Sequence, residues 1–198
     1  MKHLFLCCTA AVLAHALSSC QTVGGYPTTG GYLFKPATIV ASARDAVSDG
    51  YWDKPRDLEG EHVIVVDTEL QQAKYYINGR QVGLSAISSG KAGHGTPKGE
   101  FSIISKDINH KSSSYGSIVD ARGNVLVADY TSGEPIPRGG IYKGAEMNFG
   151  MHITRNGIWM HEGLVTSAPE SHGCIRLPRK MAKIFFENTP VGSTVIIK

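Results

Sequence analysis

The sequence has few cysteines, no excess of either charge, and no hydrophobic run long enough to span a membrane comfortably. Its 198 residues carry 20 Lys and Arg against 17 Asp and Glu, which gives a formal net charge of +3. Proteins that bind nucleic acid usually present a strongly basic face, so this near balance indicates no nucleic-acid partner. With 41% hydrophobic and 8% aromatic residues, the composition excludes a disordered or collagen-like chain and suffices for one domain core.

The longest apolar stretch lies at the N-terminus, between residues 4 and 17, after a short basic start. Its length is typical of the apolar part of a secretory signal and is short for a membrane span. It ends in residues 17–20 (LSSC), which resemble the bacterial lipoprotein signal, where cleavage precedes a cysteine that is then acylated. We therefore expect export, a signal peptide over residues 1–19, and lipidation of Cys20. Cleavage elsewhere, with Cys20 left free, is the alternative.

Processing at this site would leave one free thiol in the mature chain. Cys7 and Cys8 would leave with the signal peptide and Cys20 would carry lipid, so Cys174 would have no cysteine to pair with. In an oxidising compartment a lone thiol is buried and inert, joined to another molecule, or reactive. The neighbours of Cys174 in the sequence favour the reactive thiol.

The chain is predicted to contain one compact domain over residues 61–198. Residues 20–60 are expected to form a lipid-anchored tether and an N-terminal extension, because residues 21–36 are rich in Gly, Thr and Pro. A short helix around residues 38–47 and a packing segment at residues 51–52 are expected between the tether and the domain.

The domain is predicted to be mainly β, with one helix. Alternating and β-branched runs, and the turn signal Asn78-Gly79, predict strands. They are expected at residues 62–67, 74–77, 81–88, 101–105, 125–128, 151–155, 157–160 and 194–197. The helix is predicted after Pro178, because Met181 and Phe185 fall on one face at helical spacing and Pro190 ends the pattern.

Residues 159–163 (WMHEG) and 171–177 (SHGCIRL) carry the chemistry-bearing side chains of the domain. A cysteine nucleophile needs a thiolate, which a nearby imidazole produces by accepting the thiol proton. Cys174 is the candidate nucleophile, and His161 and His172 are the candidate bases. The backbone N–H groups of Gly173 and Cys174 are candidate donors to a developing oxyanion.

Two other uses of these residues stay open. The first is a zinc site, whose ligands would be His152, His161, His172 and Cys174, although their spacing matches no usual zinc motif. The carboxylate of Glu162 is a second candidate catalyst. The remaining histidines are expected to be surface or hydrogen-bonded structural residues: His62, His94, His110 and His152.

At these motifs the sequence resembles the L,D-transpeptidase catalytic domain, also called the YkuD or ErfK/YbiS/YcfS/YnhG family, of bacterial cell-wall enzymes. Residues 171–177 match the family's cysteine motif letter for letter. Residues 95–101 (GTPKGEF) resemble its TPxGxF element, and residues 192–198 (GSTVIIK) its closing strand. The resemblance spans residues 61–198. It implies a β-sandwich-like fold with mixed sheets and one helix after the cysteine motif, with no metal and no organic cofactor.

The resemblance also implies a role for each residue of the site. Cys174 would be the nucleophile, His161 its general base, and the backbone carbonyl of Glu162 would orient the imidazole. His172 and Gly173 would line the catalytic centre. The residues implied to bind substrate are Ser171, Arg176, Tyr115 and Tyr142. Only nine residues separate His161 from Ser171, fewer than in many members of the family, which predicts a changed lid over the site.

The activity implied by the resemblance is acyl transfer on peptidoglycan stem peptides, in the service of cell-wall biogenesis and cell shape. The thiolate would attack the carbonyl of the third residue, a diamino acid, of a tetrapeptide stem. The terminal D-alanine would be expelled and a thioester to Cys174 would remain. The acyl acceptor would be another stem, giving a 3→3 cross-link, or a lysine of an envelope protein. Two alternatives remain: an L,D-carboxypeptidase or endopeptidase that uses water with the same site, and a non-catalytic wall-binding lipoprotein.

These expectations together place the protein in the cell envelope, held to a membrane by its lipid anchor. Gln21, and not an aspartate, follows the lipidated cysteine. This favours the periplasmic side of the outer membrane over the inner membrane.

Overall fold

The structure, a computed structural model, describes residues 49–198, which all belong to one compact unit, Ile39–Lys198. The expected signal peptide, Cys20 and the short helix around residues 38–47 lie outside the described residues. None of the helices in the described part is long and apolar enough to cross a membrane.

The first sheet has six strands in the order β1-β4-β3-β2-β11-β5. The strands are β1 (Gly50–Trp52), β2 (His62–Asp67), β3 (Gln72–Ile77), β4 (Arg80–Ala86), β5 (Gly99–Ser102) and β11 (Thr194–Ile197). β2, β3 and β4 form an antiparallel meander whose second turn is the predicted Asn78-Gly79 pair. The sheet is mixed because β11 pairs parallel with β2 and antiparallel with β5.

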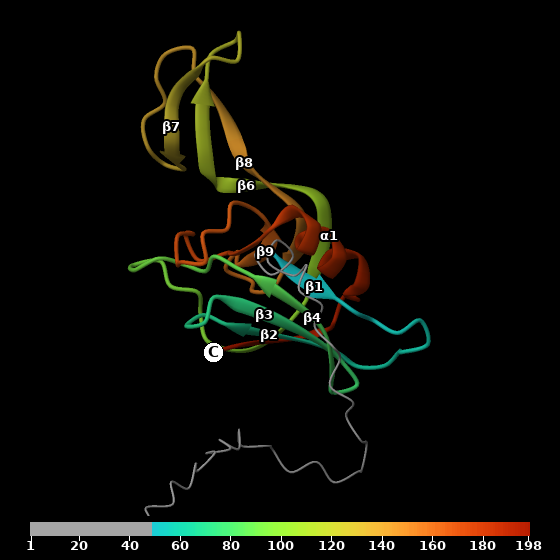
Figure 1. Cartoon of the computed structure of the whole chain (residues 1–198). Helices are drawn as coiled ribbons and strands as arrows, with labels where there is room; N and C mark the ends of the chain where they lie inside the picture. Colours follow the sequence, from blue (N-terminus) through green and yellow to red (C-terminus); the bar gives the residue numbers. More distant parts are fainter. Residues whose placement is uncertain (1–48) are drawn as a thin grey trace, which may run out of the picture. The chain divides into compact units, whose positions relative to one another are not determined.

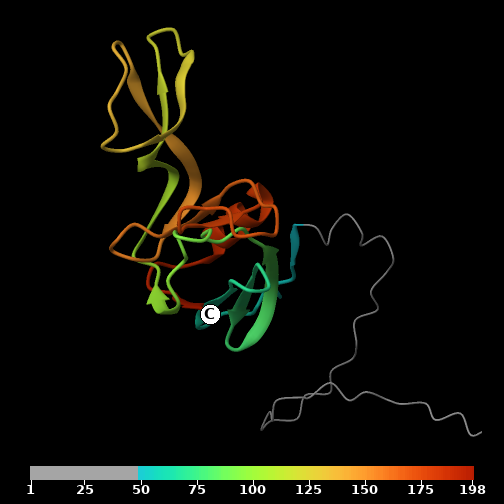
Figure 2. The same cartoon turned by 90° about the vertical axis from the view of Figure 1, so that its left-hand side faces the viewer.

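The second sheet has five strands in the order β10-β9-β8-β6-β7. The strands are β6 (Ser105–Val119), β7 (Val125–Thr131), β8 (Ile141–His152), β9 (Trp159–Glu162) and β10 (Ile175–Leu177). β9 and β10 run parallel, and the other neighbours are antiparallel. β7 and the adjoining parts of β6 and β8 project from the rest of this unit (Figure 1 and Figure 2).

The helix α1 (Arg179–Asn188) contacts β1 of the first sheet and β8, β9 and β10 of the second (Figure 1). Its buried face carries Met181 and Phe185, as the spacing predicts. The ring of Tyr75 makes edge contacts with Phe185, 5.1 Å between centroids, and with Trp52, 5.0 Å. These contacts join helix and first sheet in one core, and the prediction of a mainly β fold with mixed sheets and one helix is confirmed.

Three strands lie where the sequence predicted none: β1, β6 apart from its first residue, and β10. The strand β8 also begins ten residues before the strand predicted at residues 151–155. β1 precedes the expected domain start and pairs with β4, and its Trp52 packs against the core. β6 covers residues 105–119, SKDINHKSSSYGSIV, most of whose side chains are not buried. Such a segment lacks the alternating apolar pattern that identifies a strand. Its extended form is instead supported by a long antiparallel ladder with β8.

Candidate active site

The two segments singled out in the sequence lie side by side at the end of the second sheet. β9 and β10 pair in parallel, with Met160 opposite Ile175 and His161 opposite Arg176. Continuing this register by one residue puts Cys174 beside Trp159. Because alternate residues of a strand point to the same face, the side chains of His161 and Cys174 share one face of the sheet.

The thiol of Cys174 is half-buried and has two backbone contacts. Its sulfur accepts a hydrogen bond from the Trp159 N–H at 3.4 Å, and its S–H faces the Gly157 carbonyl oxygen at 3.8 Å. Burial raises the pKa of the Cys174 thiol, while the Trp159 N–H and the Arg176 guanidinium act in the opposite direction. At neutral pH the resting group is therefore the protonated thiol.

The imidazole of His161 is buried and held by the adjacent backbone. Its Nδ1–H donates to the Glu162 carbonyl oxygen at 2.6 Å. Burial lowers the pKa of His161 to about 4; the Glu162 carbonyl works against this, and the positive charge of Arg176 adds to it. The ring is thus neutral at neutral pH, and with the proton on Nδ1 its Nε2 lone pair is available to accept another. This is the state that a general base needs.

The carboxylate of Glu162 is engaged away from the imidazole. Both of its oxygens accept hydrogen bonds from Arg179 Nη1, at 3.0 and 2.8 Å. The part of Glu162 that contacts His161 is its backbone carbonyl, as the family resemblance implies.

His161 and Cys174 line the same cavity, of about 450 Å³. Other residues of its wall are His110, Tyr115, Glu146, Trp159, Leu164 and Arg176. No hydrogen bond joins the imidazole to the thiol in the described structure. Catalytic hydrogen bonds are often long or misaligned before substrate binds, and here the S–H would have to rotate from Gly157 to reach His161.

The loop that carries Cys174 is braced from within by Ser171. This side chain is 1% exposed, and its hydroxyl donates to the Cys174 carbonyl and accepts from the Gly173 N–H at 3.1 Å. The Gly173 N–H is therefore occupied, whereas the Cys174 N–H has no hydrogen-bond partner among residues 49–198. Of the two amides considered from the sequence, only that of Cys174 is free to meet an oxyanion. Gly173 has φ +114°, and a Cβ on it would lie 2.9 Å from Ile158, so the position requires glycine.

The TPxGxF-like element, residues 95–101, also holds the loop that carries Cys174 in place. The hydroxyl of Thr96 accepts the Gly90 N–H at 2.9 Å and donates to the Gly173 carbonyl at 2.8 Å. Because the Gly173 carbonyl and the Cys174 N–H belong to one planar peptide, fixing the carbonyl also fixes the direction of the free N–H.

His172 and Tyr115 form a wall between two adjoining cavities. Their rings stack at 4.3 Å with an interplanar angle of 18°. Both residues, together with Arg176, line the first cavity and a second one of about 620 Å³. Burial lowers the pKa of His172, and the nearby positive charge of Lys91 adds to this. His172 makes no hydrogen bond with Cys174 in the described structure.

Tyr142 is placed differently from Tyr115. Its hydroxyl lies 2.9 Å from the carbonyl oxygens of both Ser112 and Tyr115, and Tyr142 lines neither cavity. It supports the backbone of β6 beside the site and does not offer its hydroxyl to the pocket.

Sequence reasoning missed a stack of three rings at the site. The indole of Trp159 lies between the imidazoles of His110, at 3.8 Å, and His152, at 4.4 Å. His110 also lines the catalytic cavity and contacts Asp107 at 3.3 Å. These residues come from β6, β8 and β9, and only the cross-strand register brings them together, so no local sequence signal marks them.

The structure does not arrange the proposed zinc ligands into a metal site. Within residues 49–198, no group of three or more His, Cys, Asp or Glu side chains is arranged to hold a metal ion. Cys174 is free of any disulfide in this part of the chain. The cysteines Cys7, Cys8 and Cys20 lie outside the described residues.

The fold is similar to those of solved L,D-transpeptidases. An L,D-transpeptidase from Mycobacterium smegmatis aligns with 70% of this chain and 58% of its own, at 23% identity and a TM-score of 0.53. L,D-transpeptidase 3 from Mycobacterium tuberculosis, in complex with a faropenem-derived adduct, aligns with 69% of this chain and 60% of its own, at 21% identity and a TM-score of 0.52. The chain thus spans less than two thirds of the length of these relatives. At such identities the likeness establishes the fold.

Comparison with curated proteins finds no match. The model of the YkuD family, the L,D-transpeptidase catalytic domain, matches residues 61–197, which include His161, Cys174 and every strand except β1. The chain therefore belongs to the YkuD L,D-transpeptidase catalytic domain family.

Proposed function

We propose that this protein is a cysteine-dependent L,D-transpeptidase that acts on peptidoglycan stem peptides through a thioester acyl-enzyme. The observation that carries the proposal is the shared cavity of Cys174 and a neutral His161, whose ring is oriented by the Glu162 carbonyl. Membership in the family supports the same conclusion.

The pKa shifts of Cys174 and His161 favour general-base catalysis over a thiolate–imidazolium ion pair formed before substrate binds. Burial holds the thiol protonated and the imidazole neutral. When a substrate carbonyl approaches, the Cys174 proton moves to Nε2 of His161 as the sulfur forms its bond to carbon. The negative charge that develops on the carbonyl oxygen is then met by the free Cys174 N–H.

The intermediate collapses by breaking the bond to the terminal D-alanine. The departing amine takes the proton from His161, so the imidazole returns to its neutral state and the acyl group stays on Cys174 as a thioester. An acceptor amine then attacks the thioester, loses a proton to His161, and leaves with the acyl group while the thiol is restored. The acceptor is the side-chain amine of a second stem or a lysine of an envelope protein.

Arg176 and Tyr115 are the residues best placed to contact substrate. Both line the two adjoining cavities, so a guanidinium and a phenol border each of them. An Arg at this place suits a substrate carboxylate, which it binds through paired hydrogen bonds.

The test of the proposal is incubation of the reduced protein with purified tetrapeptide muropeptides, followed by mass spectrometry. Dimers that have lost one D-alanine are the expected product. Tripeptides without dimers would indicate the hydrolase instead, and unchanged muropeptides would favour a non-catalytic wall-binding protein. Cys174→Ala is the matched control, because it removes one sulfur atom at a half-buried position.

We further propose that the mature chain begins at a lipidated Cys20 and that the protein works in the cell envelope, on the periplasmic side of the outer membrane. The support is the apolar run before residue 18, the LSSC motif and Gln21 after it. A family that acts on peptidoglycan is consistent with this location.

A further inference from the structure

Residues 88–90, which follow β4, are hydrogen-bonded to both ends of residues 171–176, the nucleophile loop that carries Cys174. At one end, the Ser89 carbonyl accepts the Ser171 N–H at 2.9 Å. At the other end, Ser88 and Arg176 exchange two backbone hydrogen bonds of 3.0 Å each. Ser88 and Ser89 are 0% and 2% exposed. The position of Cys174 therefore depends on the position of this short segment.

The segment lies beyond the end of the β3–β4 ladder. The last pair of that ladder is Gln72 with Ala86, and the preceding residue, Gln71, leaves the strand with φ +51°. The Gln71 carbonyl still accepts the Ile87 N–H at 3.0 Å. Since the backbone of Gln71 has turned away, no strand partner remains for the buried Ser89 N–H.

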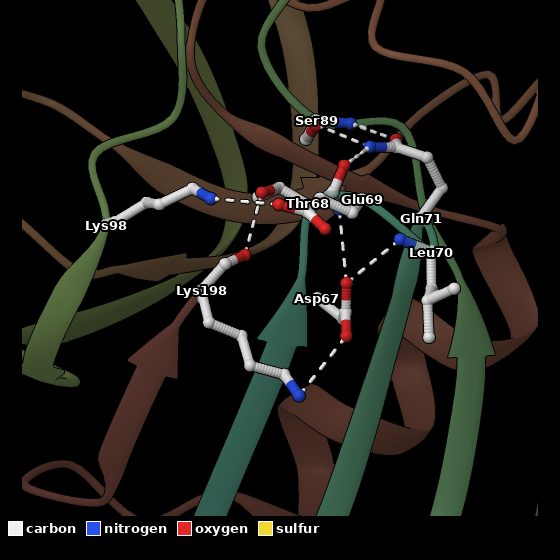
Figure 3. A network of polar contacts seen from close by, with 8 residues as sticks. All are labelled: Asp67, Thr68, Glu69, Leu70, Gln71, Ser89, Lys98 and Lys198. Atoms are coloured by element: carbon white, nitrogen blue, oxygen red, sulfur yellow. Dashed lines mark hydrogen bonds and ion pairs between the residues drawn. The ribbon is translucent and has the colours of Figure 1, made fainter.

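The side-chain amide of Gln71 takes the place of that missing strand partner. Its Oε1 accepts the Ser89 N–H at 2.9 Å, and its Nε2 donates to Ser89 Oγ at 2.7 Å (Figure 3). Gln71 is 5% exposed, and a buried amide with both of its ends bonded holds its partner in one direction. A non-glycine residue at positive φ is also uncommon and persists only where its surroundings fix it.

Gln71 is itself fixed by the turn between β2 and β3. Its Nε2 donates to the Thr68 carbonyl, and Asp67 closes the turn by accepting the N–H groups of Glu69 and Leu70 at 3.1 and 2.9 Å. Thr68 donates through both its N–H and its hydroxyl to the carbonyl of Lys198 (Figure 3). The network thus starts on the central strands of the first sheet and ends at the nucleophile loop.

We propose that Gln71 is a positioning residue for the nucleophile. It lines neither cavity, so it acts through Ser89: it fixes residues 88–90, and these fix the direction of the Cys174 N–H and sulfur. The effect on catalysis rests on the function proposed above, whereas the effect on the order of the loop does not.

The test compares Gln71→Met with Gln72→Met in the full chain. Both changes remove an amide at similar length, and the side chain of Gln72 has no hydrogen bond in the described part of the chain. The first readout is acylation of Cys174 by a carbapenem, which needs a placed sulfur and an oxyanion donor. Misplacement of reacting groups by about 1 Å lowers rates up to about a hundredfold, so Gln71→Met should slow acylation by about 10- to 100-fold and Gln72→Met by less than about twofold.

The second readout is alkylation of Cys174 by iodoacetamide, which needs a thiolate and no oxyanion donor. Gln71→Met should change this rate far less than the acylation rate. The third is hydrogen exchange in the peptide that covers residues 168–176, which should be faster in Gln71→Met than in Gln72→Met. Ser89→Ala, which keeps the Ser89 N–H bond to Gln71, is a milder second variant in case Gln71→Met does not fold. It should slow carbapenem acylation and speed hydrogen exchange in residues 168–176, as Gln71→Met does, but by less.

The possible results separate the two proposals. A folded Gln71→Met protein with normal acylation and normal exchange in residues 168–176 would overturn the positioning role, even if its melting temperature fell. A wild-type protein that forms no adduct and no product would contradict the proposed function, and hydrogen exchange would still decide whether Gln71 orders the loop.

Discussion

Trp159 donates its backbone N–H to the sulfur of Cys174 at 3.4 Å, while its indole is sandwiched between His110 and His152. An N–H donor stabilises the thiolate relative to the thiol, so this contact works against the burial that raises the pKa of Cys174. The stacked rings hold the strand that supplies the donor. The reactivity of the thiol therefore depends on residues from three strands as well as on its own motif.

The first prediction concerns the nucleophile and its base. Cys174→Ala and His161→Ala should each lower turnover by at least about a thousandfold, because they remove the attacking atom and the group that takes its proton. Turnover is measured by mass spectrometry of muropeptide products, with circular dichroism to show that the fold persists. His172→Ala is the comparison and should be milder. If His161→Ala kept most of the activity and His172→Ala lost it, His172 would be the base.

The chemistry-bearing residues could be predicted from the sequence because they lie in two short contiguous motifs. Residues 159–163 and 171–177 needed only to be brought together, and the parallel pairing of β9 with β10 does so. The alternating strands of the first sheet and the helix after Pro178 were predictable for the same local reason. In these strands and in this helix, the spacing of apolar residues along the chain identifies the element.

The supports of the site could not be predicted, because they depend on register between distant segments. Thr96 reaches Gly173 across 77 residues, and Gln71 reaches Ser89 across 18. A polar side chain that replaces a missing strand partner, as Gln71 does, produces no repeating pattern of apolar and polar residues by which the sequence could reveal it. The polar strand β6 was missed for a related reason, since backbone pairing and not buried side chains supports it.

The second prediction concerns the pH dependence of acylation. Burial lowers the pKa of His161 to about 4, so the imidazole is neutral and able to accept a proton throughout the range from pH 5.5 upward. The rate of carbapenem acylation, followed by intact-protein mass, should therefore vary little between about pH 5.5 and 8 and fall only as pH approaches 4. In His161→Ala the thiolate alone reacts, and the rate should rise about tenfold per pH unit below the thiol pKa.

Two controls accompany this measurement. The adduct should be absent from Cys174→Ala and should persist after treatment with a metal chelator. Loss of the adduct on chelation would revive the zinc alternative, and a wild-type rate as steep in pH as that of His161→Ala would remove the general-base role from His161.

The third prediction concerns stability against pH. His161 titrates near 6.5 when unfolded and at about 4 when folded, so between these values the unfolded chain binds more protons than the folded one. The contribution of His161 to stability is therefore complete above pH 6.5 and is lost as pH falls toward 4. The difference in pKa corresponds to at most about 3 kcal/mol.

Urea unfolding at several pH values measures this effect. His161→Gln, which has no titrating ring, should lose less unfolding free energy than the wild type between pH 6.5 and 4. The comparison also cancels the contributions of His62 and His172, whose pKa values burial lowers in the same direction. Equal losses in the two proteins would show that His161 is not held neutral in the fold.

The fourth prediction concerns the N-terminus, which lies outside the described residues. Because residues 17–20 resemble a lipoprotein signal, the wild-type protein should fractionate with membranes and its mature form should begin at an acylated Cys20. Cys20→Ala should release a soluble form or leave the precursor uncleaved, whereas Cys174→Ala should stay with the membrane. A wild-type protein that washes off membranes and starts at another residue would contradict the anchor.

The last prediction concerns Thr96, whose hydroxyl joins the Gly90 N–H to the Gly173 carbonyl. Thr96→Val keeps the shape of the side chain and removes both hydrogen bonds, which should lower the free energy of unfolding by about 1–3 kcal/mol. It should also slow carbapenem acylation by more than the loss of folded protein explains, since the peptide that carries the Cys174 N–H is no longer held. Thr96→Ser keeps the hydroxyl and should retain most of the rate. If Thr96→Val lost stability but its folded fraction reacted at the wild-type rate, Thr96 would serve the fold alone, and the direction of the Cys174 N–H would have to be set by Ser171 and by the segment that Gln71 holds.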